Sequence, residues 1–146
     1  MKIAIVYASV HHNNTEKLVK EAGKMVTMDL FSIQEARKAD LSGYDMVGIA
    51  SGIYFGKLHK SLLDYLEEKP SLPKKAFGIV TCGDGSDKHK KSVWELLEGF
   101  GFEAVGVYVC KGFDTYGPFK WIGGINKKHP NQKDIEACAT FVKKLI

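Results

Sequence analysis

Polar side chains able to bind an anion are concentrated where the opening apolar segment gives way to a helical pattern. The sequence of residues 9–15 is SVHHNNT, directly after an apolar run. In a parallel α/β sheet such a loop lies at the carboxyl edge of a strand, and the amino end of the next helix points into it. Free N–H groups and the helix dipole there favour an anion, most often a ligand's phosphate. The donor side chains belong to Ser9, His11, Asn13, Asn14 and Thr15. We therefore predict a phosphate-binding loop; the alternative is a simple helix cap with nothing bound.

A second loop places aromatic side chains between two glycines. Residues 51–59 have the sequence SGIYFGKLH. Aromatic rings at the edge of a sheet can stack on a planar ligand, at about 0.5–1.5 kcal/mol beyond simple burial, and glycine lets the backbone approach a ring closely. The expected contact residues are Ser51, Gly52, Ile53, Tyr54, Phe55 and Gly56. The alternative is that Phe55 only folds over the end of the sheet.

A third loop, residues 82–88, has the sequence CGDGSDK and contains no aromatic residue. Its glycines can expose backbone N–H groups to the polar edge of a ring. The expected contact residues are Cys82, Gly83, Asp84 and Gly85. Alternatively, Asp84 and Asp87 end a strand and cap the helix that follows.

Residues 111–129 form a long aromatic segment, KGFDTYGPFKWIGGINKKH, after the last expected strand. Long ordered loops in compact domains are often binding lids. We expect one of its aromatic rings to cover a bound ring or to line a second site. The alternative is a flap packed on the outer edge of the sheet.

Apolar, β-branched runs alternate with helical patterns along the whole chain. The expected strands are residues 2–7, 26–31, 46–50, 75–81 and 103–110. The helical stripes are Leu18, Val19, Ala22 and Met25; Leu62, Tyr65 and Leu66; Val93, Leu97 and Phe100; and Ile135, Cys138, Ala139, Val142 and Leu145, with a weaker turn at 33–39. Strands that alternate with helices pair in parallel through crossover connections. We predict an α/β three-layer sandwich around a five-stranded parallel sheet, in a single domain of residues 1–146. In its last helix, Asn131 is the expected cap, with Asp134 in the first turn.

Composition and charge exclude several classes of protein. No apolar run approaches the roughly 18 residues of a membrane span, and no signal-cleavage site follows the apolar start, so a cytoplasmic location is expected. The net charge of +4 comes almost wholly from lysine, with Arg37 the sole arginine. Specific readers of nucleic acid rely on arginine, so that function is not expected. A mild positive field favours acidic partners or anionic substrates.

The three cysteines do not indicate a disulfide framework or a metal site. They are odd in number, far apart and not in CxxC spacing. Cys110 and Cys138 are expected to be buried and inert, whereas Cys82 borders a glycine-rich loop and can be exposed. His11 and His12 are adjacent, and adjacent side chains rarely converge on one ion.

Together, the three loops resemble those of the flavodoxin family, and the likeness covers nearly the whole chain. The segment YASVHHNNTEKL resembles the family's FMN-phosphate loop, with one extra residue and with histidines where threonine or glycine is usual. Tyr54, Phe55 and Gly56 resemble the aromatic–glycine element that flanks the inner face of the flavin. The resemblance implies the strand order 2-1-3-4-5, FMN as cofactor, and residues 82–85 beside the pyrimidine. It also implies that the carbonyl of Gly56 accepts a hydrogen bond from N5–H of the reduced flavin.

The resemblance implies an electron-transfer protein that passes electrons between redox partner proteins. The alternative is a small FMN-dependent oxidoreductase acting on a quinone or porphyrinogen, because SGIYFGKLHKSL also resembles the flavodoxin-like protoporphyrinogen oxidase group. A scaffold that has lost its cofactor is a third possibility, disfavoured by the intact polar loop. The first loop lacks the cysteine and arginine of low-molecular-weight phosphatases, the aspartate of response regulators and the GxGxxG of dinucleotide-binding domains.

The chain also departs from the flavodoxin pattern. Flavodoxins are usually strongly acidic, whereas this chain carries a net charge of +4. With Lys57 beside the aromatic loop, that charge is expected to favour the reduced, anionic flavin and to raise its potential. The missing aromatic in residues 82–88 leaves the usual outer-face stack without a partner in that loop.

Overall fold

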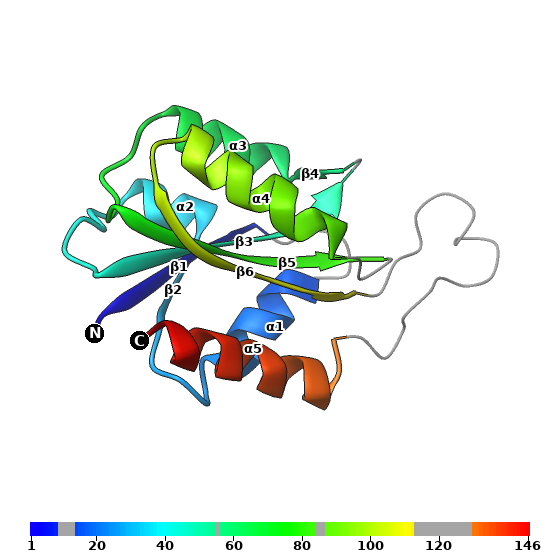
Figure 1. Cartoon of the computed structure of the whole chain (residues 1–146). Helices are drawn as coiled ribbons and strands as arrows, with labels where there is room; N and C mark the ends of the chain where they lie inside the picture. The colour runs from blue at the N-terminus through cyan, green and yellow to red at the C-terminus, as the bar shows by residue number, and fades with distance from the viewer. Residues whose placement is uncertain (9–13, 55, 84–86, 113–129) are drawn as a thin grey trace.

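A central parallel sheet with helices on both faces organises the molecule (Figure 1). The computed structural model describes residues 1–8, 14–54, 56–83, 87–112 and 130–146. Within these residues the strands are β1 (Ile3–Ala8), β2 (Asp29–Ser32), β3 (Met46–Tyr54), β4 (Lys57–Leu58), β5 (Lys75–Cys82) and β6 (Glu103–Lys111). The helices are α1 (Asn14–Ala22), α2 (Ile33–Arg37), α3 (Lys60–Glu67), α4 (Lys88–Gly99) and α5 (Gln132–Leu145).

The strand order is β2-β1-β3-β5-β6, and all these neighbours pair in parallel. Once the short β4 is left out of the numbering, this is the predicted order 2-1-3-4-5, so the α/β fold prediction is confirmed. The chain adds β2 on one side of β1 and β3 on the other side. The direction of winding therefore reverses between β1 and β3, whose last paired residues are Ala8 and Ser51.

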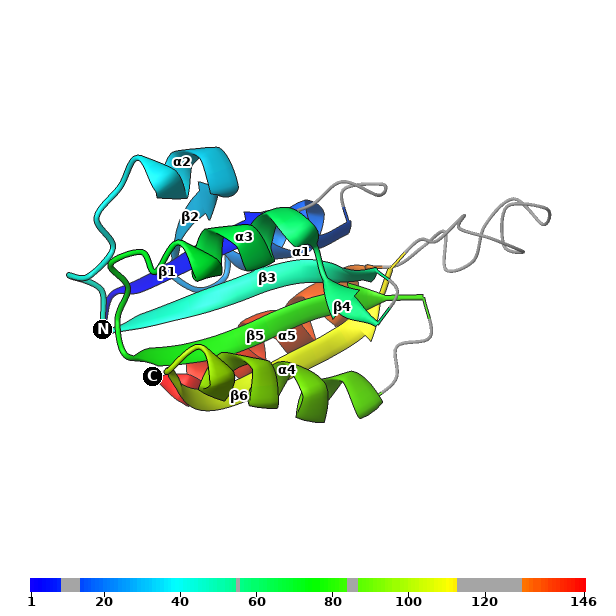
Figure 2. The same ribbon diagram turned by 90° about the horizontal axis from the view of Figure 1, so that it is seen from above.

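Two apolar clusters, one on each face of the sheet, hold the layers together. Helices α2, α3 and α4 cover one face and α1 and α5 cover the other (Figures 1 and 2). The buried apolar residues of α1 and α5 are Leu18, Val19, Ala22, Ile135, Cys138, Ala139 and Val142, as their helical spacing predicted. Both termini lie at the end of the sheet opposite the tips of the parallel strands (Figure 1).

Local signals start two of these helices. Asn131 and Asp134 form a reciprocal capping box at the start of α5, which confirms the predicted cap. Ser32 and Glu35 form the same box at α2, the weak helical turn expected around residues 33–39. Hydrogen bonds from Ser32 hold the pKa of the Glu35 carboxyl below its ordinary value.

The largest differences from the sequence-based expectation concern β3, β2 and α1. Strand β3 continues through Tyr54 and turns into the antiparallel β4, so the prediction that residues 51–59 are all loop was wrong. The second strand covers Asp29–Ser32 rather than residues 26–31, although Val26 and Met28 are buried in the core. Met25 is 41% exposed because α1 ends at Ala22, before the stripe reaches it.

Tyr65 offers a direct test of the packing beneath α3. Its ring is buried, and its hydroxyl finds no hydrogen-bond partner among the described residues. A buried hydroxyl without a partner costs stability, and burial also raises the pKa of Tyr65. We expect Tyr65→Phe to raise the free energy of unfolding by about 1 kcal/mol, measured by urea denaturation. A loss of more than about 1 kcal/mol would mean that the hydroxyl is hydrogen-bonded in solution.

Candidate functional site

The candidate site lies at the carboxyl ends of the parallel strands, where the winding of the sheet reverses. Ligands of open α/β sheets bind at such a reversal, outside the carboxyl ends of the strands. Here the reversal lies between Ala8 of β1 and Ser51 of β3. Helices α1 and α4 follow β1 and β5 directly, and α3 follows the short β3–β4 hairpin, so the amino ends of all three helices lie at this edge (Figure 2).

Of the predicted phosphate loop, only its last two residues are within the described part of the chain. Ser9, His11 and Asn13 lie outside it. Thr15 is buried in the first turn of α1, and its hydroxyl lies 3.1 Å from the hydroxyl of Thr81 in β5. This buried hydrogen bond fixes the start of α1 against β5. The side chain of Thr15 therefore serves the internal packing of the site.

Asn14, the first residue of α1, lies against the end of β6. A Cβ built on Gly112 would come within 2.6 Å of Asn14 Nδ2 and 3.2 Å of Asn14 Cβ. The N–H of Gly112 in turn donates to the carbonyl of Cys82 at 3.1 Å. The beginning of α1 and the ends of β5 and β6 thus meet at one point, and the absence of a side chain at residue 112 makes room for Asn14.

The second loop is a hairpin that is fixed to the start of α3 through Ser51. Ser51 is buried, and its hydroxyl accepts from the N–H of His59 at 2.9 Å while donating to the carbonyl of Gly52 at 2.7 Å. Strand β4 pairs back onto β3, with Ile53 opposite Leu58. The Ser51 hydroxyl is therefore engaged within the protein, and it sets the geometry of the hairpin.

Tyr54 packs on its own hairpin. A Cβ at Gly52 would come within 2.9 Å of the Tyr54 hydroxyl oxygen, so the tyrosine side chain lies over Gly52. On its other side the Tyr54 ring meets the ring of His59 edge to face, with centroids 5.3 Å apart. The hairpin therefore presents an aromatic pair whose tyrosine is held in place by contacts on two sides.

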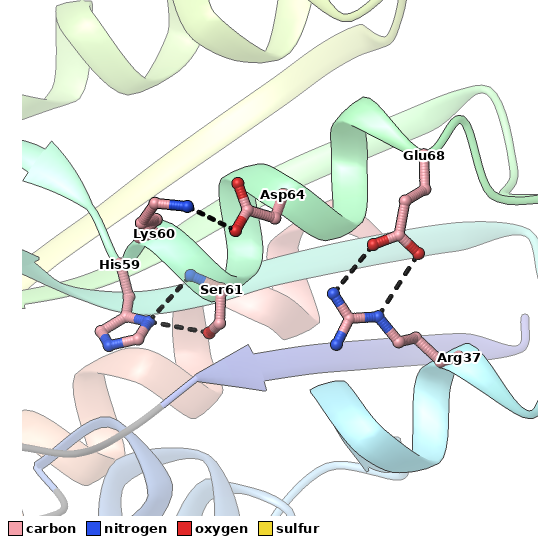
Figure 3. A network of polar contacts seen from close by, with 6 residues as sticks. All are labelled: Arg37, His59, Lys60, Ser61, Asp64 and Glu68. Atoms are coloured by element: carbon pink, nitrogen blue, oxygen red, sulfur yellow. Dashed lines mark hydrogen bonds and ion pairs between the residues drawn. The ribbon is translucent and has the colours of Figure 1, made fainter.

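One ring nitrogen of His59, Nδ1, is held by hydrogen bonds at the start of α3. Its Nδ1 accepts from the backbone N–H of Ser61 at 3.1 Å and lies 2.7 Å from the Ser61 hydroxyl, as Figure 3 shows. This is a side-chain cap on α3. Because Nδ1 acts as the acceptor, the neutral ring carries its proton on Nε2. His59 thus combines helix capping with support of the Tyr54 ring.

Gly56 provides the tight turn of the hairpin. Its φ is +77°, a conformation that favours glycine, and a Cβ there would meet nothing within 4 Å. The backbone at Gly56 is exposed, and the neighbouring Lys57 is exposed as well. Phe55 lies outside the described residues. An accessible backbone beside a cation and an aromatic pair suits contact with a planar anionic ligand.

The third loop is described at its two ends. Cys82 is the last residue of β5 and is buried, so the suggestion that it can be exposed was wrong. It is buried because its backbone joins the sheet and meets Gly112. Gly83 is half-buried, and Asp84 and Gly85 lie outside the described residues. Asp87 occupies the position before α4 without a side-chain cap bond and pairs with Lys90 at 3.3 Å.

All three cysteines are buried, free thiols. Burial raises the pKa of the Cys138 thiol to about 12 and raises the pKa of Cys110 as well. Because the thiolate is the reactive form, we expect no fast reaction with a disulfide reagent at pH 8 in the folded protein. The measurement is thiol titration with and without denaturant, and three equivalents should react only after unfolding. Rapid reaction of one thiol in the native protein would contradict this description.

The sole arginine has a structural position away from the site edge. Arg37 forms a two-contact ion pair with Glu68, at 2.8 and 3.3 Å, joining α2 to the end of α3 (Figure 3). A cavity of about 600 Å³ also lies toward this opposite edge, between the segments that follow α3 and α4. Its lining includes Pro70, Leu72, Phe100 and Phe102. Among the described residues no histidine, cysteine and carboxylate groups gather as a metal site, and no helix is long and apolar enough to cross a bilayer.

Two residues that shape this edge were not among the predicted site residues. His59 was included only as the end of a loop, and Gly112 only as part of the aromatic segment. The sequence did carry a signal for His59, since a histidine just before a helical stripe can accept at the cap. The contact between Gly112 and Asn14 joins residues far apart in sequence and carries no local signal.

Comparisons with known proteins agree with this architecture. A sequence model described as Flavodoxin domain matches residues 4–116. An uncharacterized protein of Methanocaldococcus jannaschii is 40% identical over 148 aligned positions, which cover 100% of this chain and 99% of that protein.

The similar solved structures have low sequence identity and show the shared fold. A flavodoxin from the domain Archaea has a TM-score of 0.68 at 17% identity, with 96% of this chain and 92% of that chain covered. The flavodoxin of Fusobacterium nucleatum bound to flavin mononucleotide has a TM-score of 0.62 at 13% identity, covering 100% and 99%. The rubredoxin oxygen:oxidoreductase of Desulfovibrio gigas has a TM-score of 0.69 at 18% identity, covering 97% of this chain. This chain spans only 34% of the length of that oxidoreductase.

Proposed function

Because this chain belongs to the flavodoxin family, we propose that it binds FMN and passes electrons between redox partners. The proposed binding edge consists of the carboxyl ends of β1, β3 and β5, within a single domain of residues 1–146. The observation that carries the proposal is the meeting of Asn14, Gly112 and Cys82 at the carboxyl ends of β5 and β6, on the same edge of the sheet as the β1/β3 reversal. Flavodoxins are themselves the reference case for ligand binding at this reversal, with FMN between β1 and β3.

The residues present would contact FMN mainly through backbone groups and charged side chains, and less through the buried hydroxyl groups. The hydroxyls of Thr15 and Ser51 are engaged within the protein, so we propose that they position the loops. Asn14 and the residues before it, with the amino end of α1, would hold the phosphate. The exposed Gly56 backbone, with open space around it, would contact the flavin through its carbonyl. The proposed backbone contacts of Cys82 and Gly83 lie on the pyrimidine side.

Bound FMN supplies one- and two-electron chemistry, and the protein's contribution is binding, orientation and charge. Tyr54, held between Gly52 and His59, would face the ring without needing to rearrange. The exposed Lys57 beside the hairpin turn favours a negatively charged reduced ring. We therefore propose potentials that are higher than those of acidic flavodoxins.

The direct test is FMN titration of the purified flavin-free chain. We expect quenching of FMN fluorescence that saturates at one equivalent, and no quenching with riboflavin at the same concentration because riboflavin lacks the phosphate. Equal binding of the two compounds would contradict a phosphate site at α1. The absence of any quenching by FMN would contradict FMN binding itself.

Turnover distinguishes an electron carrier from an oxidoreductase. A carrier exchanges electrons with redox proteins and shows little steady turnover with small acceptors. Steady turnover of the FMN-loaded protein with a soluble quinone, lost when residues 113–121 are deleted, would favour the small oxidoreductase instead. The circular dichroism spectrum of the deletion variant must match that of the full chain for this comparison to hold.

A further inference from the structure

Exposed lysines are concentrated at the edge of the sheet that holds the candidate site. They occupy the first turns of α1, α3, α4 and α5, the turn of the β3–β4 hairpin and the end of β6. We call this set the basic edge: Lys17, Lys57, Lys60, Lys88, Lys90, Lys91, Lys111 and Lys133. The acidic residues in these same first turns and helix starts are Glu16, Asp87 and Asp134. Three of the lysines form exposed ion pairs, Lys60 with Asp64 at 2.9 Å, Lys90 with Asp87 at 3.3 Å and Lys91 with Glu95 at 3.9 Å. Lysine therefore predominates at this edge.

These lysines stand at helix ends where a positive charge is electrostatically unfavourable. The amino end of a helix carries a partial positive charge, which favours acidic residues in the first turn by about 0.3–1 kcal/mol each. Neither α3 nor α4 has an acidic residue in its first turn. Lys60 begins α3, and Lys88, Lys90 and Lys91 fall in the first turn of α4. The exposed ion pairs of Lys60, Lys90 and Lys91 contribute only about 0–1 kcal/mol each, so they offset this cost without explaining why lysine stands at the positive ends of the helices.

The opposite edge of the sheet has a mixed charge. There acidic and basic side chains alternate and form pairs, such as Glu21 with Lys24 at 3.1 Å and Glu68 with Arg37 at 2.8 Å. The acidic residues at that edge include Asp45, Glu67, Glu98 and Glu103. Among the residues that the structure describes, lysine is thus in clearer excess over acidic residues at the edge where the ligand is proposed to bind.

A large aromatic side chain adjoins the basic edge. Trp94 on α4 is 37% exposed. It follows Lys90 by four residues and Lys91 by three, which places all three on one side of the helix. Tryptophan is enriched among the residues that dominate the binding energy of protein interfaces. An exposed tryptophan beside lysines suits a protein partner better than it suits solvent.

We infer that the basic edge and Trp94 form a docking surface for an acidic protein that exchanges electrons with the bound flavin. The inference rests on the proposed function for the place of the flavin, and the charge distribution supplies the chemistry of the partner. Its lysines lie on helices from both faces of the sheet. One small anion cannot touch all of them, whereas the surface of a protein can.

The test measures binding, which does not require electron transfer. The probe is a fluorescently labelled, acidic [4Fe–4S] ferredoxin, and its anisotropy is followed as the FMN-loaded chain is added. We expect the Kd to rise about 10-fold or more between 0.05 and 0.3 M NaCl as the charges are screened. The double variant Lys88→Glu/Lys91→Glu should raise the Kd by about 10-fold at low salt, and Trp94→Ala should raise it too.

A matched control keeps the net charge change but moves it to the other edge. Lys69→Glu/Lys74→Glu changes two exposed lysines there and should leave the Kd within about twofold. The α4 variant places acids where the helix dipole favours them, so weaker binding is not explained by loss of folding. Equal weakening by both double variants, or the absence of salt-dependent binding, would overturn the inference.

Two further results would distinguish protein docking from the binding of a small anion, and from the proposed FMN function. If the α4 variant slows turnover with anthraquinone disulfonate but leaves ferredoxin binding unchanged, the surface serves a small anion and the docking inference is wrong. If FMN does not bind but the flavin-free chain still binds ferredoxin through Lys88 and Lys91, the docking surface stands and the proposed function fails.

Discussion

Replacing Gly112 with valine is expected to weaken FMN binding by about 10- to 100-fold. Any Cβ at this position meets Asn14, at 2.6 Å from Nδ2 and 3.2 Å from Cβ, so the asparagine amide must turn away from its present position. A hydrogen bond to a charged acceptor contributes about 1.5–3 kcal/mol, and its loss accounts for this change in Kd. The measurement is the FMN titration, with the Kd compared between variant and parent.

The control for Gly112→Val is Gly43→Val. A Cβ at Gly43 meets nothing within 4 Å, and the residue lies in an exposed turn before β3. This variant should bind FMN as the parent does. Unchanged binding by Gly112→Val, with native circular dichroism, would show that Asn14 does not hold the phosphate. Equal loss of affinity in both variants would point to a general effect of valine on folding.

Replacing Gly48 with alanine is expected to destabilise the whole fold by about 1–3 kcal/mol. Gly48 lies in β3, between Ile5 of β1 and Phe77 of β5, which are its register partners. A Cβ there would collide with Ile5 Cδ1 and approach the Phe77 ring to 2.7 Å. The residues are fully buried, so the ring cannot move aside without opening the core. Thermal denaturation should show a fall in Tm of about 3–10 °C.

A change at Phe77, the register partner of Gly48 in β5, can verify the cause of this destabilisation. Phe77→Leu alone opens space and should also destabilise the protein. Combined with Gly48→Ala, however, it should cost less than the sum of the two single changes, because the smaller side chain accommodates the new methyl group. Strict additivity would mean that Phe77 is not the obstacle. Gly43→Ala, with open space around the residue, should leave Tm nearly unchanged.

Helices and central strands were largely predictable because their signals are local. The structure buries most of the apolar run at residues 3–8, and it buries the helical stripe of Leu18, Val19 and Ala22. The cap at Asn131 follows from a polar side chain three residues before Asp134. The parallel pairing also followed, since strands that alternate with helices pair through crossover connections, whereas the strand order came from the family resemblance.

The hairpin at β3 and β4 was missed because its sequence signals conflict. Ser51 and Gly52 usually weaken a strand, so the pattern predicted a loop after Ala50. In the structure the Ser51 hydroxyl is satisfied by the N–H of His59, and Tyr54 covers the bare backbone of Gly52. These contacts outweigh the local preference. Only the folded chain brings together the groups that make them.

The order of the residues determined the fold class, the parallel pairing and the edge where polar loops gather, because hydrophobic periodicity and crossover topology depend on neighbours along the chain. The strand order itself came from the family resemblance. Tertiary structure decided which polar groups remain for a ligand. It paired Thr15 with Thr81, buried Cys82, placed Gly112 under Asn14 and set the lysines of four helices along one edge. Those relations join segments far apart in sequence, so packing creates them and no local pattern contains them.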